Sequence, residues 1–230
     1  MRTPSCRKIL NVNHQIPEDK IEIFLSAFDQ GTFFHKKVKK DIDVLFVGAI
    51  TERRSHILTR LKSVLGDRLI VTKAFGDELN NLLNRARIIL NIHGTDHLDT
   101  ETRVFEVLGS GGFLITEKLS NESPFIPGID LIECATIDEI IQRTLSFLIE
   151  SRDESRIEIA NAGYQKVLAH HTYFSRSKHL ARKFENLKGV QYDQRAKPSY
   201  TRAKLEENIM YLASCIRKPA INFYHKLRTS

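Results

Sequence analysis

The chain has 230 residues, of which 41% are hydrophobic and 27% are charged, and its formal net charge is +7. This composition is typical of a soluble globular protein, and no apolar run approaches the roughly 20 residues that a membrane-spanning helix needs. The first residues contain no apolar stretch of signal-peptide length, so we expect a cytoplasmic protein. Three widely spaced cysteines argue against a disulfide framework and against a cysteine-rich zinc site.

The positive charge is concentrated at the two ends of the chain. Residues 1–40 carry eight basic and four acidic side chains, and residues 191–230 carry eight and three, so the middle is slightly acidic. A nucleic-acid-binding domain more often carries its charge on the folded body, so we expect no nucleic acid as a partner. The basic ends suit solubility or weak contact with an acidic surface such as a membrane.

Short buried strands and amphipathic helices alternate along most of the chain. Apolar runs predict strands over 41–48, 69–71, 87–92, 113–116 and 130–134. Helical spacing and capping residues predict helices over 51–66, 77–86, 102–108, 137–150, 153–169, 173–187 and 202–217. This alternation predicts an α/β fold, a Rossmann-like parallel sheet with helices on both faces, followed by a helical C-terminal extension.

The predicted elements divide the chain into three parts. Residues 1–40 form an N-terminal extension, 41–187 form the α/β domain, and 188–230 form a linker and a basic amphipathic helical tail. The tail places apolar residues at helical spacing, namely Leu205, Ile209, Leu212 and Ile216. We expect this stripe to be covered by the domain itself, by a second copy of the chain or by a separate subunit.

Ligands of a parallel α/β sheet bind at the carboxyl ends of the strands, and this rule selects three loops, 48–54, 93–101 and 109–112. In the first loop, Gly48 follows a strand, and Arg53 and Arg54 lie at the start of the next helix. Helix N-termini and guanidinium groups both bind phosphate. The loop has neither a dinucleotide fingerprint nor a P-loop, so a plain turn with solvated arginines is the simpler interpretation.

The second loop is rich in polar side chains of the types that ligate metals. It contains His93, Asp96, His97, Asp99 and Glu101. Their spacing matches no defined zinc or calcium loop. We therefore favour a polar loop beside a ligand pocket, and we expect no metal.

The third loop ends the run 102-TRVFEVLGSGGFLITE-117, whose helical part carries one carboxylate, Glu106, among apolar residues. The helix dipole disfavours a carboxylate near a helix carboxyl end. A partner that needs a strong acceptor, such as a pair of sugar hydroxyls, would explain Glu106. Gly109, Gly111 and Gly112 permit close approach of a ligand. A solvent-facing glutamate and a glycine C-cap are the equally open alternative.

This run, the strand RIILNIHG before it and the segment FIPGIDLIECATIDEIIQRTLSFL after it resemble the carboxyl-terminal domain of GT-B glycosyltransferases. The resemblance is greatest to the spore-maturation-protein branch, whose members carry a similar R-V-F-E-x-L-x-x-G-G-F motif. The segment 163-GYQKVLAHHTYFSR-176 resembles the closing helix of that branch, and DVLFVGAITERRSHILTRL fits the first strand and the phosphate-side helix. The resemblance covers about residues 25–187.

The resemblance implies one half of a GT-B fold that binds a nucleotide-diphosphate sugar as donor substrate. It implies that Glu106 accepts hydrogen bonds from the ribose hydroxyls and that Gly48, with Arg53 or Arg54, faces the diphosphate. Arg103 is expected to support the pyrophosphate or Glu106. GT-B enzymes typically neutralise the leaving diphosphate with helix dipoles and basic side chains, so the resemblance implies neither a metal nor another cofactor.

The resemblance also places the turn that follows Glu106 beneath the nucleotide or its sugar. The turn residues are Gly109, Ser110, Gly111 and Gly112. We therefore expect all four to belong to the donor-binding site.

The chain departs from the complete GT-B pattern. A GT-B enzyme has two Rossmann-like domains of roughly 100–200 residues each, with catalysis in the cleft between them. Here the residues before the first strand resemble the interdomain linker, and no counterpart of the acceptor domain, which supplies the catalytic base in inverting members, precedes them. No base is therefore assigned, and His93 is the nearest candidate as well as a candidate donor-binding residue.

These observations predict the donor-binding domain of a metal-independent glycosyltransferase that transfers a sugar to an unknown acceptor. The alternative is a non-catalytic nucleotide-sugar-binding module or subunit. The expected partners are a nucleotide sugar and either an acceptor-domain subunit or a second copy of the chain.

Overall fold

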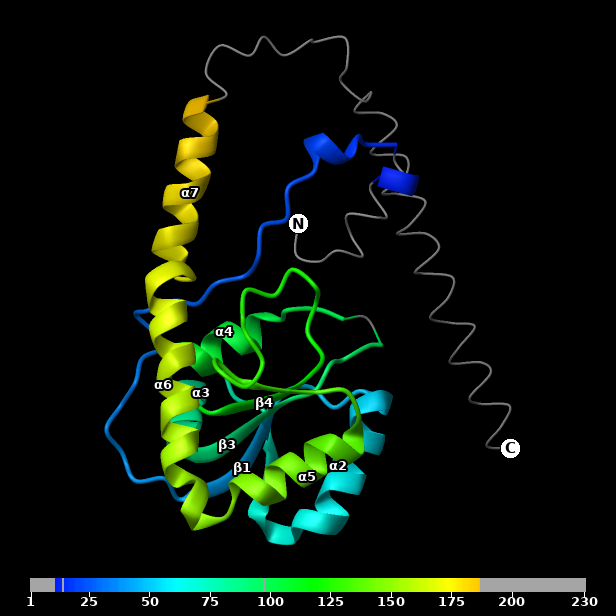
Figure 1. Ribbon diagram of the computed structural model, residues 1–230, viewed down its shortest axis with the longest axis vertical. Helices are drawn as coiled ribbons and strands as arrows, with labels where there is room; N and C mark the ends of the chain where they lie inside the picture. Colours follow the sequence, from blue (N-terminus) through cyan, green and yellow to red (C-terminus); the bar gives the residue numbers. More distant parts are fainter. Residues whose placement is uncertain (1–10, 14, 97, 187–230) are drawn as a thin grey trace, which may run out of the picture. The chain divides into compact units, whose positions relative to one another are not determined.

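The computed structural model describes residues 11–13, 15–96 and 98–186, and Figure 1 shows the arrangement of their elements. The chain divides into a compact unit up to Arg182 and a second unit from Lys183 onward. Five parallel strands form one sheet in the order β2-β1-β3-β4-β5. The strands are β1 (Ile42–Val47), β2 (Leu69–Thr72), β3 (Ala86–Asn91), β4 (Leu114–Glu117) and β5 (Ile132–Cys134).

Helices cover both faces of this sheet, so the predicted Rossmann-like α/β architecture is confirmed (Figure 1). The α-helices that follow the first strand are α2 (Glu52–Leu65), α3 (Gly76–Arg85), α4 (Thr102–Gly109), α5 (Ile137–Phe147), α6 (Asp153–His170) and α7 (Tyr173–Asn186). Short 3-10 turns lie at Glu18–Lys20, Gly66–Arg68 and Glu150–Arg152. Among the described residues, every helix is too short or too polar to span a bilayer.

The strands distribute their side chains between two cores, because successive residues of a strand point to opposite faces. On β1, Val44 and Phe46 pack in the core beneath α2 and α5, whereas Leu45 and Val47 pack with α3 and α4. The central strands are buried on both faces, which explains their nearly continuous apolar sequence.

The ends of helix α2 follow the expected capping pattern. Thr51 is the N-cap, and its hydroxyl oxygen accepts a hydrogen bond from the backbone N–H of Arg54 at 3.3 Å. Gly66 ends the helix with a φ of 55°, a left-handed conformation that favours glycine. These caps fix where α2 starts relative to the end of β1, and therefore where its first arginines lie.

The part of the predicted N-terminal extension around Phe28 packs against the α/β domain. Phe28 is almost completely buried, and its backbone forms a parallel bridge with Thr172. Arg176 donates hydrogen bonds to the carbonyl oxygens of Leu25 and Ser26. Buried apolar side chains hold this segment on the domain.

Two buried asparagines of α3 hold the next part of that segment. Asn84 accepts a hydrogen bond from the backbone N–H of Lys36 at 2.6 Å and donates one to the carbonyl oxygen of Phe34 at 3.0 Å. Asn80 accepts from the backbone N–H of Phe34 at 3.3 Å. These side chains satisfy backbone groups of an irregular segment, as burial of such a segment requires.

The carboxyl-terminal part of the prediction is only partly described by the structure. The predicted helix over 173–187 corresponds to α7. The predicted linker and tail over 188–230, including the apolar stripe over 202–217, lie outside the described residues.

Candidate functional site

The strand order creates a crevice at the carboxyl edge of the sheet. The chain leaves β1 toward α2 on one face and leaves β3 toward α4 on the other face, and β1 and β3 are neighbours. Such a switch point is where open α/β sheets bind ligands. A cavity of about 540 Å³ lies at this edge. Its lining includes Gly48, Arg54, Lys73, Phe75, Glu101 and Arg103.

Arg54 is held at the wall of this cavity by backbone carbonyl groups. Its Nε donates to the carbonyl oxygen of Ile92 at 2.9 Å, and its Nη1 donates to that of Ala49 at 3.0 Å. The guanidinium lies over the Phe46 ring at 5.5 Å from the centroid, and Nη2 is 3.8 Å from Glu101 Oε1. The positive charge is therefore fixed in place at the cavity before any ligand arrives.

Two glycines border the Arg54 guanidinium. A Cβ at Gly48 would lie 3.4 Å from Arg54 Nη1, and a Cβ at Gly94 would lie 3.7 Å from the guanidinium carbon. These are ordinary van der Waals distances, so a side chain at either position would cover the guanidinium without a severe clash. The glycines thus leave the charged group open.

Arg53 has a different role from Arg54, although either of the two was expected to face the diphosphate. Its two Nη atoms donate to the Glu117 carboxylate at 2.9 and 2.6 Å, and its Nε donates to Asp96 Oδ1 at 2.7 Å. Its Nη1 also donates to the carbonyl oxygen of His93 at 3.0 Å. The hydrogen bond to Glu117 raises the pKa of Arg53 above its usual value. Arg53 is absent from the cavity lining and clamps the loop after β3 onto the end of β4.

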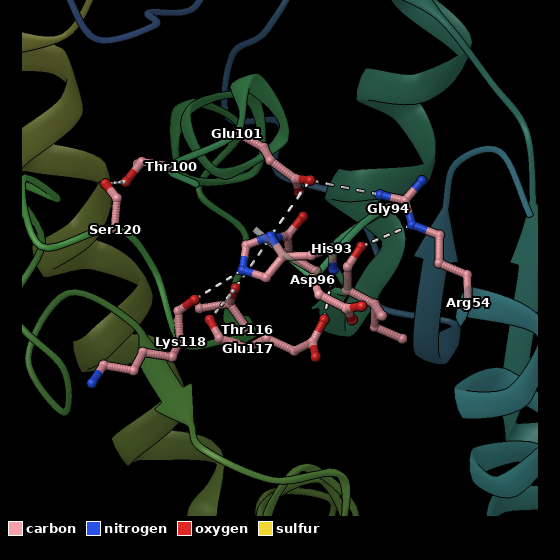
Figure 2. A network of polar contacts seen from close by, with 12 residues as sticks. Arg54, His93, Gly94, Asp96, Thr100, Glu101, Thr116, Glu117, Lys118 and Ser120 are labelled. Carbon is pink, nitrogen blue, oxygen red and sulfur yellow. Dashed lines mark hydrogen bonds and ion pairs between the residues drawn. The ribbon is translucent and has the colours of Figure 1, made fainter. Parts of the chain in front are cut away.

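Figure 2 shows His93 at the centre of a polar network that includes Glu101, Glu117 and Lys118. The residue is 2% exposed, and its backbone N–H donates to Glu117 Oε2 at 2.6 Å. Its Nε2 lies 2.8 Å from the carbonyl oxygen of Lys118, and its Nδ1 lies 3.5 Å from Glu101 Oε1. Both ring nitrogens thus face acceptors, whereas a general base needs a nitrogen that faces the substrate. His93 does not line the cavity, and its catalytic and donor-binding roles stay predictions.

The surroundings of His93 make its charge dependent on folding. Burial lowers the pKa of the imidazole, but hydrogen bonds with Glu101 and Lys118 and the charges of Glu101 and Glu117 outweigh burial, so the pKa is raised. A group whose pKa rises on folding stabilises the protein fully below its unfolded pKa, here about 6.5. This stabilisation is lost as the pH rises through the folded value.

We therefore expect the free energy of unfolding to fall as the pH increases above about 6.5, by at most about 1.4 kcal/mol per pH unit for this one proton. Urea unfolding across this range measures the slope. His93→Gln should make the slope shallower, whereas the exposed His56→Gln on α2 should leave it unchanged. Equal slopes for the wild type and His93→Gln would contradict the assignment.

Arg103 and Glu106 form an ion pair beside the cavity. Arg103 Nη1 lies 2.9 Å from Glu106 Oε2, and the two side chains are 20% and 19% exposed. Burial raises the pKa of Glu106, and the nearby Arg103 opposes this effect. Arg103 lines the cavity and Glu106 lies one helical turn behind it. The structure thus places Arg103 beside Glu106, and the roles of the two residues in donor binding stay predictions.

The glycine turn lies at the opposite edge of the sheet, which corrects its expected place beneath the nucleotide. Helix α4 starts at the carboxyl edge and runs back, so the turn after it leads into the amino end of β4. Gly111 lines a second cavity, of about 590 Å³, together with Asp41 and Arg87 near the amino ends of β1 and β3. The turn precedes a strand, and the carboxyl-end rule applies to loops that follow one.

In this position the turn residues pack against the core. A Cβ at Gly109 would lie 2.4 Å from the Phe28 ring, and a Cβ at Gly112 would lie 2.6 Å from the Ile89 side chain. Ser110 is completely buried and donates to Asn80 Oδ1 at 2.8 Å. The structure thus explains these small residues by close packing.

The connection between β2 and α3 was not predicted to belong to the site. Lys73 and Phe75 line the cavity from this side, and both are exposed. Its position in the sequence indicates the site, because the connection directly follows a predicted strand. Ligands bind at the carboxyl ends of such strands, as they do at the loop after β1.

Comparison with known families agrees with this geometry. A family model described as glycosyl transferase-like matches residues 32–182. The chain belongs to this family. Comparison with curated proteins finds no match.

Solved glycosyltransferase structures share the fold of this glycosyl transferase-like chain. A sucrose-phosphate synthase from Thermosynechococcus elongatus aligns with a TM-score of 0.61 and 10% identity, over 83% of this chain and 58% of that one. HepE from Anabaena, in complex with UDP and glucose, aligns with a TM-score of 0.64 and 10% identity, over 81% and 62%. The C-terminal domain of LpcC from Francisella tularensis aligns with a TM-score of 0.51 and 10% identity, over 64% and 99%.

These alignments identify the part of a GT-B fold that the chain represents. The chain spans about three fifths of the length of the first two structures and almost all of an isolated C-terminal domain. The expected half of a GT-B fold is therefore confirmed at the level of the fold.

The loop considered for metal binding has another role in this family member. Asp96 binds Arg53, and Glu101 lies between His93 and Arg54. In the part of the chain that the structure describes, no three His, Cys, Asp or Glu side chains gather as a ligand set. These two acidic residues of the loop thus pair with arginines of α2 and with His93.

Proposed function

We propose that the chain is the donor-binding domain of a glycosyltransferase and that its cavity takes the nucleoside diphosphate of a nucleotide sugar. The observation that carries this proposal is the cationic cavity at the switch point of a glycosyl transferase-like sheet. Arg54, Lys73 and Arg103 line it, against two carboxylates, Asp99 and Glu101. The structural neighbour from Anabaena, in complex with UDP and glucose, supports the same class of ligand.

The diphosphate would lie between Arg54 and the amino end of α4. The Arg54 guanidinium is held in place, and helix N-termini attract anions. When the glycosidic bond of a donor breaks, the electron pair stays with the leaving diphosphate. Arg54 and Arg103 would stabilise that charge, so we propose transfer that does not require a metal.

Glu106 would accept hydrogen bonds from the ribose hydroxyls, as the resemblance implies. The carboxylate lies beside Arg103, which reaches the cavity. Burial raises the pKa of Glu106, because few groups there solvate its charge. Ribose hydroxyls that donate hydrogen bonds to the carboxylate would stabilise its charged form. The arginine–glutamate pair fits the R-V-F-E motif, and we propose the spore-maturation-protein branch on this basis.

A matched pair of arginine variants on α2 tests the proposal. Arg54→Gln should weaken binding of a nucleoside diphosphate by about ten- to a hundredfold, because hydrogen bonds to charged groups are worth about 1.5–3 kcal/mol. The matching nucleoside should lose much less. Arg60→Gln is the control, since Arg60 lies on the same helix and pairs with Asp138 on the surface.

A thermal-shift panel of UDP, GDP, dTDP, CMP and ADP first selects the nucleotide, because ligands of the folded state raise its apparent stability. Calorimetry with the best nucleotide then measures the variants. Equal losses for diphosphate and nucleoside would contradict the phosphate role of Arg54. A panel without any shift would overturn the proposed function.

A non-catalytic nucleotide-sugar-binding module is the second candidate. The observation that favours it is the coverage, because the chain spans only about three fifths of two of its structural neighbours. If the chain acts as a glycosyltransferase, a separate acceptor-domain subunit or a second copy of the chain would complete its active site. Product formation from donor and acceptor favours the transferase, and nucleotide binding without turnover favours the module.

A further inference from the structure

Phe75 is the most exposed large hydrophobic residue in the part of the chain that the structure describes. Its relative exposure is 81%, and it lines the cavity. It also occupies the N-cap of α3, where it makes no side-chain capping hydrogen bond. Ser, Thr, Asp or Asn is favoured at this position because it stabilises the helix end. The sequence thus combines an exposed aromatic ring with an uncapped helix at the mouth of the site.

The charges around the cavity separate it into two ends. Arg54 and Arg103 line it beside β1 and α4. At the other end, Phe75 is followed by two acidic residues in the first turn of α3, Asp77 and Glu78. Acidic residues oppose the binding of phosphate at that helix end. The end at Phe75 carries one cation, Lys73, against the two acidic residues of α3, so it suits an uncharged planar group better than the diphosphate, which the two arginines favour.

We infer that Phe75 is the platform on which the nucleobase of the nucleotide stacks, and this inference rests on the proposed function. Every base has a π-face, so stacking on an aromatic side chain tolerates different bases. Phe75 therefore contributes affinity for all nucleoside diphosphates. Polar groups elsewhere in the cavity select among the bases.

Calorimetry on the full chain with two probes tests the platform. The probes are the nucleoside diphosphate that binds tightest in the panel and inorganic pyrophosphate, which has no base. Phe75→Ala should weaken the nucleoside diphosphate by about ten- to a hundredfold and leave pyrophosphate unchanged. Phe75→Tyr should bind like the wild type. Phe174→Ala is the matched control, because Phe174 on α7 is 69% exposed and is absent from the cavity lining.

A tryptophan substitution gives an independent readout. The chain contains no tryptophan, so Phe75→Trp introduces a single indole. Its fluorescence should change on addition of the nucleoside diphosphate and stay constant with pyrophosphate.

The failures of the two proposals are distinguishable. Unchanged nucleotide affinity in Phe75→Ala, or equal losses for the two probes, would overturn the platform while the proposed function stands. A wild-type chain that binds no nucleotide of the panel would overturn the proposed function and the platform with it.

Discussion

Replacement of Gly163 by alanine is expected to destabilise the protein by about 2 kcal/mol. A Cβ at this position of α6 would lie 2.4 Å from the carbonyl oxygen of Asp130 and 2.8 Å from a methyl carbon of Leu108. Overpacking of a core costs about 1–3 kcal/mol. In an exposed helix the same change would stabilise by about 1 kcal/mol, because glycine is a poor helix former.

The clash makes the substitution destabilising overall, because the backbone carbonyl of Asp130 cannot rotate away as a side chain can. The segment that contains Asp130 is also held in place, since its carboxylate accepts hydrogen bonds from Lys166 Nζ at 2.5 Å and from the backbone N–H of Ile126 at 2.7 Å. Urea unfolding measures the change. Gly31→Ala is the control, because a Cβ there meets only the Asp29 side chain, at 3.4 Å or more. A Gly163→Ala protein as stable as the wild type would show that α6 shifts freely.

Glu117→Gln is expected to destabilise the protein by about 2–3 kcal/mol. The carboxylate accepts two hydrogen bonds from Arg53 and one from the backbone N–H of His93. Hydrogen bonds to a charged group are worth about 1.5–3 kcal/mol, and the amide keeps part of this interaction. Loss of the negative charge should also lower the pKa of His93, to which it contributes.

Two measurements follow this change. Urea unfolding gives the stability, with the exposed Glu158→Gln on α6 as control. NMR titration of the His93 ring gives its pKa. Nucleotide affinity should fall as well, because the loop that Glu117 holds carries Glu101 to the cavity wall. An unchanged titration curve for His93 would contradict the network in which Glu117 binds both Arg53 and His93.

The fold could be predicted from the sequence because local patterns of residues indicate its strands and helices. Apolar runs mark the strands, and Thr51 and Gly66 mark the ends of α2. The position of the binding edge follows from the alternation of strands and helices, so the loop with Gly48 and Arg54 was found. The course of α4 also follows from this alternation, and it would have excluded Gly111 from the site.

The different roles of the adjacent Arg53 and Arg54 could not be predicted from the sequence. Successive helical residues point in directions about 100° apart, so only one of Arg53 and Arg54 faces the cavity. Their partners, Glu117 and the carbonyl oxygen of Ile92, are far along the chain. Likewise, nothing local indicates that Asn80 and Asn84 are buried, because their partners are backbone groups of a distant segment.

The contact between Phe28 and the end of α6 has a consequence for synthesis on the ribosome. Phe28 donates its backbone N–H to the carbonyl oxygen of His171, and Tyr173 donates its own to the carbonyl oxygen of Phe28. These bonds join the two ends of the domain, so they form only after residue 173 has left the exit tunnel. Closing so long a loop is entropically costly and makes late contacts slow. Until then the backbone of Phe28 lacks the two hydrogen bonds that tie it to the end of α6.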